Sequence, residues 1–265
     1  MKKISVFLAL LALFFCDLAL AAAVATSVTG SVSAQAGSAP ARVVRQGDQL
    51  NQGDTVITGA NSTAVLKFDD GSVAALTQNS RMTVTAYQYN RANESGNSLL
   101  SLITGGMRVI TGLIGKHSPD RVAYRAATAT IGIRGSDGQI ATAGGDVIVA
   151  VNTGAFSLTK NGQTFTIPAG QAIHSRSNGT FTRGSVAQVL RSASTTPAGQ
   201  TVTNAINSII NNPQLNNAVN NANPGTPPQG QPGQPGQPSN PPPVTPGTTG
   251  GPQGGGAGGG GASGG

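Results

Sequence analysis

Cysteine and tryptophan are nearly missing from this chain. Its 265 residues include one cysteine, Cys16, and no tryptophan. A single thiol excludes intramolecular disulfides. Because Cys16 lies in an apolar N-terminal segment, we expect the rest of the chain to use neither thiol catalysis nor cysteine-ligated metals.

Charged residues are also scarce, at 9% of the chain, and none follows Arg191. The formal net charge is +7, but the basic residues stand singly along the sequence. Clustered cations with stacking rings, which are typical of nucleic-acid binding, are not found. We therefore expect no nucleic-acid partner, and weak attraction to anionic envelope polymers is a sufficient consequence of the basicity.

The N-terminus has the pattern of a secretory signal. Two lysines precede an apolar run, Ile4–Leu20, and Ala23–Ala25 has the small residues of a cleavage site before Thr26. Asp17 interrupts the run, which favours a removed signal over a retained membrane anchor. The sequence predicts a signal peptide over residues 1–25, a periplasmic or extracellular location, and no transmembrane segment after cleavage.

Composition divides the remaining chain into three parts. Residues 26–190 alternate short apolar runs with Gly, Asn and Asp, and we expect one all-β domain. Residues 191–223 are rich in Asn and Ala and include a possible short helix. Residues 224–265 consist mainly of Pro, Gly and Gln, which predicts a disordered tail that serves as a tether or spacer.

The periodicity of residues 26–190 is that of strands. Ala64–Phe68 and Ser72–Leu76 flank an Asp-Gly turn, which predicts a hairpin. Arg81–Tyr87 alternates, and this predicts Met82 on one face and Tyr87 on the other. Further strands are expected at residues 56–58, 99–103, 107–110, 121–125, 139–142, 147–151, 156–159, 164–167 and 171–174. The predicted fold is a compact β-sandwich or a short β-solenoid-like domain.

One helix is expected beyond this domain. Val202, Ala205, Ile206, Ile209 and Ile210 follow helical spacing behind Thr201 or Thr203 as the cap. Its polar face is rich in poor helix formers, so the helix is expected to form when docked. Docking on the β domain and binding of a partner are both compatible with this pattern.

Residues for catalysis or metal binding are few. His117 and His174 have no metal-ligand spacing to another His, Cys or carboxylate, so we expect no metal and no cofactor. Asp69 and Asp70 are adjacent, but they lie at the predicted turn, where Asp is expected for backbone reasons. A hydrolase would have to use His117, His174 or a turn aspartate as its base, and is a minor alternative to a non-enzymatic protein.

The segment Thr128–Thr142 (TATIGIRGSDGQIAT) contains glycines around a lone arginine, Arg134. Residues 132–138 look like a phosphate loop but lack the terminal Lys-Ser/Thr and do not begin a helix, so they are not expected to bind phosphate. Glycines at these positions favour a bulge or corner in a strand. We expect the Arg134 guanidinium to secure that corner through carbonyl oxygens or Asp137.

Five segments together resemble the periplasmic domain of FecR-type regulators. They are residues 46–59, 62–71, 99–108, 128–137 and 168–171. The family motif is similar to residues 128–137, with Ser136 in place of a threonine and Gly138 where an aromatic residue is common. The matching motif residues are Gly132, Arg134, Gly135, Ser136 and Asp137, for which we expect a structural role.

The resemblance implies an all-β domain that contacts proteins and does not catalyse a reaction. The best-known members are membrane-spanning sigma-factor regulators, whereas this chain starts with a signal sequence in place of the cytoplasmic segment. The anti-sigma role is therefore not carried over. The sequence favours an exported protein-binding or signalling adaptor of the bacterial cell envelope, and a structural component that binds envelope polysaccharide is the alternative.

Overall fold

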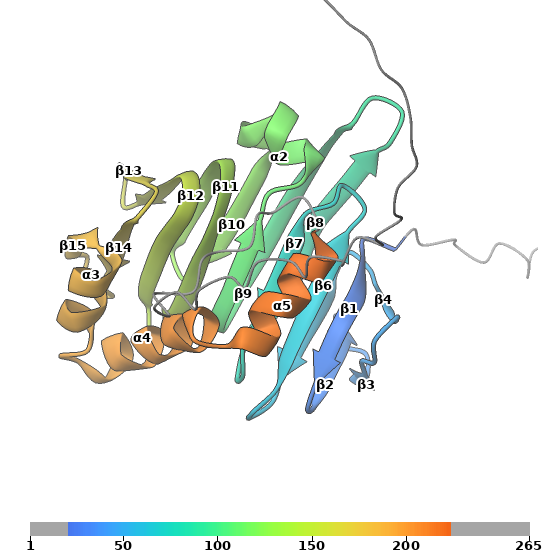
Figure 1. The fold of residues 1–265 in the computed structure, drawn as a ribbon, viewed down its shortest axis with the longest axis horizontal. Coiled ribbons are helices and arrows are strands. Elements are labelled where there is room, and N and C mark those ends of the chain that lie inside the picture. The colour runs from blue at the N-terminus through green and yellow to red at the C-terminus, as the bar shows by residue number, and fades with distance from the viewer. Residues whose placement is uncertain (1–20, 224–265) are drawn as a thin grey trace, which may run out of the picture. The chain divides into compact units, whose positions relative to one another are not determined.

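The computed structural model describes residues 21–223, which form fifteen strands and several short helices (Figure 1). The predicted tail at 224–265 and most of the predicted signal peptide lie outside the described residues. The strands are β1 Ala23–Thr29, β2 Val32–Ala36, β3 Arg42–Val43, β4 Gln49–Leu50, β5 Asp54–Thr58, β6 Thr63–Phe68, β7 Val73–Leu76, β8 Arg81–Asn90, β9 Ser95–Ile110, β10 Val122–Ala126, β11 Ala129–Ala143, β12 Asp146–Lys160, β13 Gln163–Pro168, β14 Gln171–Ser175 and β15 Phe181–Ser185. The helices are α2 Leu113–His117, η2 Pro119–Arg121, α3 Val186–Ala193, α4 Pro197–Ile210 and α5 Pro213–Ala222.

Three long strands, β9, β11 and β12, bend and run through two layers of the sheet. In the covered layer, β11 lies between β9 and β12, β9 also pairs with β7, and β12 also pairs with β14. In the open layer, β9 pairs with β8 and β10, β11 pairs with β10 and β12, and β12 also pairs with β13. The covered layer consists of β4, β1, β6, β7, residues 105–110, 137–143 and 146–151, β14 and β15. The open layer consists of β3, β2, β5, β8, residues 95–104, β10, residues 129–134 and 155–160, and β13.

The main hydrophobic core lies between these two layers. Alternate residues of the open layer, such as Met82, Leu100 and Ile131, meet alternate residues of the covered layer, such as Leu66 and Ile140. Strand alternation places every second side chain on the inner face, so two layers can share one core.

Helices α3, α4 and α5 pack on the other face of the covered layer (Figure 1). Val202, Ile206 and Ile209 of α4 form a second core with Ala141 and Ile148. Leu215, Val219 and Ala222 of α5 form a third core with Val65, Val73, Ala75 and Ile110 of the sheet. The covered layer is therefore buried on both faces, which explains uninterrupted apolar runs such as β7 and residues 147–151.

The all-β prediction is confirmed, and so is the hairpin of β6 and β7. The sequence predicted separate strands at 99–103 and 107–110, and again at 147–151 and 156–159. Each pair is one continuous strand, β9 or β12. Glycine marked these places as breaks, whereas Gly105 and Gly154 adopt positive φ within strands that bend and continue.

Tyr87 lies on the face opposite to the predicted one. A register shift between Val84 and Ala86 changes the alternation of β8, so Tyr87 is buried. Its ring lies 5.1 Å from that of Phe68, and its hydroxyl donates to Oδ1 of Asp70 at 3.2 Å. A bulge of this kind leaves no periodicity signal in a short strand.

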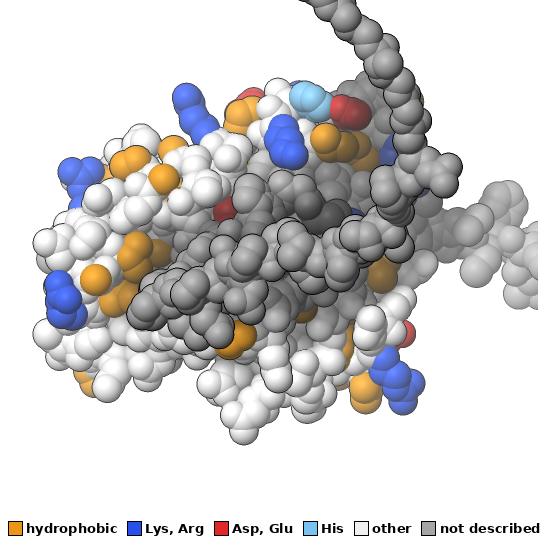
Figure 2. All heavy atoms as spheres, viewed as in Figure 1, with side chains coloured by type: hydrophobic (Ala, Val, Ile, Leu, Met, Phe, Trp, Pro, Cys, Tyr) orange, Lys and Arg blue, Asp and Glu red, His pale blue; other side chains and the backbone are white. Residues whose placement is uncertain are grey.

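The predicted helix is present as α4, and it docks on the sheet. It begins earlier than predicted, because Thr196 is the cap and Pro197 opens the first turn. Pro213 separates α4 from α5 and opens that second helix, which the sequence did not predict. No helix within residues 21–223 is long and apolar enough to cross a membrane. On the face shown in Figure 2, most described side chains are uncharged, and Lys and Arg stand apart from one another.

Candidate functional site

The motif at residues 132–137 lies at the bend of β11, where the strand leaves the open layer for the covered layer. Gly135 has φ +56°, and the pairing with β12 shifts register between Arg134 and Asp137. Gly154 lies opposite with φ +72°, and a Cβ there would be 2.5 Å from the carbonyl oxygen of Gly135. The bend depends on two glycines on neighbouring strands approaching closely.

Ser136 secures this bend through its hydroxyl group. The oxygen lies 2.8 Å and 2.7 Å from the carbonyl oxygens of Arg134 and Ala155, to which it donates. It also accepts from the amides of both residues at 3.2 Å. The backbone of Ser136 bonds Thr111 in both directions, with the Thr111 hydroxyl accepting from its amide at 2.9 Å. Serine at this position thus supplies the hydroxyl that a threonine would.

Asp137 follows on the covered layer and is 3% exposed. Arg108 of β9 donates to it twice, from Nε to Oδ1 at 2.9 Å and from Nη2 to Oδ2 at 2.7 Å. The same guanidinium donates from Nη1 to Oδ1 of Asn216 on α5 at 2.8 Å. A two-pronged, charge-assisted pair with a third bond is a strong and geometrically specific tie.

The structural role expected for the Arg134 side chain is taken by Arg108. Arg134 is exposed, and its guanidinium makes no hydrogen bond or ion pair within residues 21–223. The bend turns Asp137 to the covered side while Arg134 stays on the open side, so the two neighbours in sequence face different layers. Among the described residues, the Arg134 guanidinium therefore does not secure the bend.

A groove of about 600 Å³ lies next to Arg134 on the open layer. Gly132, Ala155 and Ser157 are small residues on its strands, and Gly132 pairs with Ser157 across β11 and β12. The remaining charged groups that line it are Lys116 of α2 and Asp120 of η2. Thr130, Thr159 and Thr166 add hydroxyl groups. The small side chains of Gly132, Ala155 and Ser157 leave this depression in the surface of the sheet.

The outer face of the open layer is largely polar, with Ile103 as an exposed apolar residue. Its charged strand residues are Arg81, Arg125 and Arg134. No carboxylate occupies an outward-facing position of its strands, which are β2, β5, β8, β10, β13 and the open-layer parts of β9, β11 and β12. Hydroxyl groups pair across strands at 2.7 to 2.9 Å. These pairs are Thr55–Thr83, Thr85–Ser101 and Thr159–Thr164. This face can donate and accept hydrogen bonds and attract anions.

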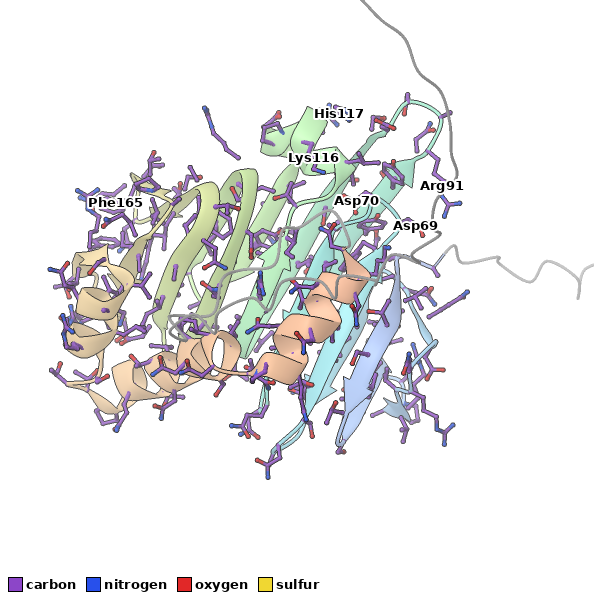
Figure 3. The ribbon with its side chains drawn as sticks, in the orientation of Figure 1. Asp69, Asp70, Arg91, Lys116, His117 and Phe165 are labelled. Carbon is purple, nitrogen blue, oxygen red and sulfur yellow. The ribbon has the colours of Figure 1, made fainter. Side chains whose placement is uncertain are left out.

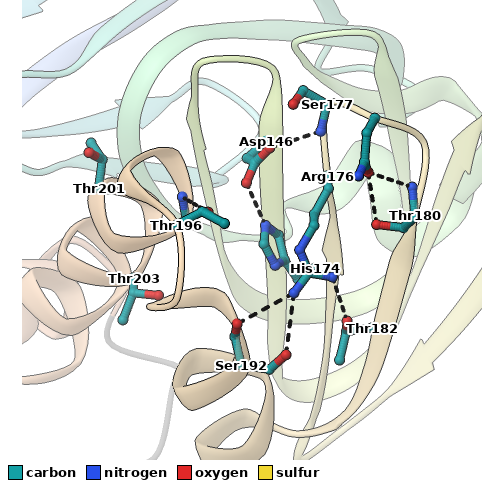
Figure 4. Close-up of polar contacts among 12 residues, drawn as sticks. Asp146, His174, Arg176, Ser177, Thr180, Thr182, Ser192, Thr196, Thr201 and Thr203 are labelled. Atoms are coloured by element: carbon teal, nitrogen blue, oxygen red, sulfur yellow. Dashed lines mark hydrogen bonds and ion pairs between the residues drawn. The ribbon is translucent and has the colours of Figure 1, made fainter.

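The two histidines lie in different surroundings. His117 is exposed on α2, beside Lys116 in Figure 3, and its Nδ1 lies 3.4 Å from Oε2 of Glu94. His174 is fully buried, and its Nε2 lies 2.9 Å from Oδ2 of Asp146 (Figure 4). Burial lowers the pKa of His174, although the bond with Asp146 acts in the opposite direction.

Asp146 and His174 are built into the turn that carries Ser177. Asp146 Oδ1 accepts from the Ser177 amide at 2.8 Å, and Arg176 bonds Thr182 at 2.9 Å and Ser192 of α3 (Figure 4). Nδ1 of His174 is buried with no hydrogen-bond partner among the described residues. This geometry fixes the loop and α3 but presents no reactive group to solvent.

The adjacent carboxylates Asp69 and Asp70 have separate structural contacts. Asp70 Oδ1 accepts from the amide and hydroxyl of Ser72 at 3.1 and 2.6 Å, as expected for a turn. Oδ2 of Asp69 lies 3.2 Å from Nη2 of Arg91. Figure 3 shows both residues. No group of three potential metal-ligating side chains occurs in the described part of the chain.

Comparison with known families identifies the segment that carries the bend. Residues 54–157 match the family described as "FecR protein". This segment is similar to the FecR domain. The resemblance predicted from the sequence is confirmed for residues 54–59 and for segments 62–71, 99–108 and 128–137. Residues 46–53 and Pro168–Gln171 lie outside the matched residues.

Solved structures give a more distant similarity. Two crystal structures of a "putative anti-sigma factor" from Parabacteroides distasonis share 13% identity with this chain, at TM-scores of 0.41 and 0.42. The alignment covers 49% of this chain and 59% of that chain, so less than two thirds of the solved protein is spanned. No curated protein matches the chain.

The departure from the family pattern at Gly138 has a structural explanation. A Cβ at Gly138 would lie 3.0 Å from Cζ of Phe156 and 2.5 Å from the carbonyl oxygen of Ala150. The ring of Phe156 thus fills the space beside position 138, and no side chain fits there. Residue 156 supplies a buried aromatic ring near the position where the resembled family commonly has one.

Two residues of the bend were missed by sequence reasoning. Arg108 ends the quoted segment Leu99–Arg108, so the resemblance contained the signal, but its partner is 29 residues away. Thr111 carried no signal, because a threonine after a strand has many possible roles. The sequence alone does not show which residues the bend brings together.

Proposed function

We propose that the protein is a non-enzymatic binding adaptor of the cell envelope, exported through a cleavable signal peptide, and that the open layer of the FecR domain contacts a protein partner. The observation that carries this proposal is the position of Arg134. It is exposed beside a groove, while Arg108 and Ser136 secure the bend.

The arrangement of the layers supports the same face. Helices α3, α4 and α5 cover one face of the sheet with the chain's own apolar side chains. The outer face of the open layer carries no such cover within residues 21–223, and it includes the exposed Ile103, 55% exposed, near Arg125 and Ser101. Arginine and isolated apolar residues around a depression are common at protein interfaces.

A charge-reversal pair tests this proposal. The tagged protein is expressed in a Gram-negative host, and proteins that co-purify from the envelope fraction are compared for wild type, Arg134→Glu and Arg191→Glu. Arg191 lies on α3 and is also exposed, so it matches the change in charge. We expect Arg134→Glu to lose a protein that wild type and Arg191→Glu retain. Equal recovery by all three contradicts the proposal.

The polar composition of the open layer favours a second candidate, a structural component that binds anionic envelope polysaccharide. Arg81, Arg125 and Arg134 lie on strands whose outward positions hold no carboxylate, so they would attract an acidic polymer. The paired hydroxyl groups would bond its sugars. Sedimentation with purified peptidoglycan tests this candidate. Binding that falls as salt rises from about 50 to 500 mM supports it, and absence of co-sedimentation at low salt rejects it.

A further inference from the structure

The first strand of the structure belongs to the main core. Ala23 and Ala25 of β1 are 1% and 0% exposed and pack in the core between the layers. Ala23 stands opposite Leu50 of β4 and Phe68 of β6, and Ala25 stands opposite Leu66. β1 therefore joins β4 to β6 through its first residues.

Backbone groups of Ala22 and Ala25 also form hydrogen bonds with residues 47–50. The amide of Ala22 donates to Leu50 at 2.8 Å, and the amide of Ala25 donates to Asp48 at 2.9 Å. The carbonyl oxygen of Ala25 accepts from the amide of Gly47 at 2.8 Å. Removal of residues 22–25 would take these partners from the Gly47 amide and from the carbonyl oxygens of Asp48 and Leu50. The loss costs most at Leu50, which is the buried residue among them.

Cleavage after Ala25, at the site expected from the sequence, would divide β1. The remaining strand would begin at Thr26, beyond the residues that pair with β4. It would also expose Leu50 and Phe68, which are 0% and 3% exposed in the intact sheet. The folded structure thus disfavours that product.

An earlier site spares the whole strand. Ala19, Leu20 and Ala21 also place small residues at the two positions that a signal peptidase recognises. Asp17 then ends the apolar core at Cys16, and the run from Ile4 to Cys16 falls within the ~7–15 residues usual for such a core. Asp17–Ala21 is then the short segment between the apolar core and the cleavage site.

We propose that signal peptidase hydrolyses the Ala21–Ala22 peptide bond, so that the exported protein begins at Ala22 with β1 complete. Water adds across this bond and leaves a carboxylate on Ala21 and an ammonium group on Ala22. The ammonium nitrogen keeps its position 2.8 Å from the Leu50 carbonyl oxygen, to which it donates. The inference rests on the proposed export.

The N-terminus of the processed protein tests the inference. The full chain with a C-terminal tag is expressed in a Gram-negative host, and the envelope protein is analysed by intact mass and N-terminal sequencing. We expect a first residue of Ala22. A first residue of Val24 or Thr26 overturns the inference alone. A chain that keeps Met1 contradicts the export proposal and the inference with it.

Two matched substitutions locate the cut independently of folding. Signal peptidase requires a small residue immediately before the cleaved bond, so it does not accept a β-branched residue there. A β-branched residue is compatible with a β-strand. Ala21→Val should abolish the Ala22 terminus, with precursor accumulating or the cut moving to a later site. Ala25→Val should leave the Ala22 terminus and the processing rate unchanged. Precursor accumulation in Ala25→Val, with normal processing of Ala21→Val, overturns the inference.

Discussion

Arg108 and Asp137 form a two-pronged ion pair, at 2.9 and 2.7 Å, in which the side chains are 2% and 4% exposed. The pair joins β9 to the bend of β11. Through Asn216, Arg108 also joins the bend to α5. The ion pair at the bend is therefore buried next to α5. Arg134, the arginine of the motif itself, is exposed to solvent.

Replacing Arg108 should destabilise the protein strongly. Arg108→Met leaves the carboxylate of Asp137 buried without this guanidinium, and loss of one partner of a buried pair costs about 3–5 kcal/mol. Arg134→Met removes an exposed charge and should change the unfolding free energy by less than about 0.5 kcal/mol. Urea unfolding of both variants measures the difference. A larger loss in Arg134→Met would reverse the roles assigned to the two arginines.

The bend should tolerate no side chain at Gly154. Gly154→Ala places Cβ 2.5 Å and 2.7 Å from the carbonyl oxygens of Gly135 and Arg134, which are backbone atoms. Gly162 has a similar φ, +74°, with nothing within 4 Å of its Cβ position. We expect Gly162→Ala to cost about 1–2 kcal/mol through backbone strain, and Gly154→Ala about 1–3 kcal/mol more. Equal losses in denaturant unfolding would show that the close approach contributes nothing.

Stability should fall in mild acid because of His174. Burial lowers the pKa of His174 in the folded state below the unfolded value of about 6.5, so the unfolded chain binds more protons as pH falls. Above pH ~6.5, His174 does not lower the free energy of unfolding. Below that pH, the free energy of unfolding declines by up to about 1.4 kcal/mol per pH unit.

The free energy of unfolding, measured at several values between pH 7.5 and 5, gives the slope of stability against pH. His174→Gln should flatten it, and His117→Gln, which changes an exposed histidine, should retain it. An NMR titration of the His174 ring should give a pKa below 6.5 directly. A His174→Gln variant with the wild-type slope would exclude His174 as the cause.

Filling the groove should reduce partner binding without destabilising the fold. Gly132 has no positive φ, and a Cβ there meets only the Ser157 hydroxyl oxygen at 2.8 Å, which can rotate away. Gly132→Val should therefore keep the melting temperature and lower the recovery of the envelope partner. Thr164→Val, on the same face outside the groove, should bind as wild type does. Unchanged recovery by Gly132→Val would separate the groove from partner binding.

The local parts of the fold could be predicted from the sequence. The Asp-Gly turn of β6 and β7 and the apolar face of α4 each depend on neighbouring residues. The bends of β9 and β12 could not be predicted, because Gly105 and Gly154 give the same signal as turns that end a strand. Whether a glycine ends a strand or bends it is decided by pairing with distant strands.

The same limit applies to the candidate site. Arg134 and Asp137 are close in sequence, which favoured a contact between them. The register shift after Arg134 turns the next residues to the other layer, where Arg108 arrives from β9. The groove itself combines α2, η2, β10, β11, β12 and β13, and no short motif encodes that combination.

Site-specific photocrosslinking in intact cells tests the binding role of the open layer most directly. A photoreactive residue is placed at Thr130, which lines the groove, or at Thr201, which is exposed on α4 of the covered side. We expect a discrete protein adduct from position 130 and none from position 201. An adduct from position 201 alone, or none from either position, would contradict it.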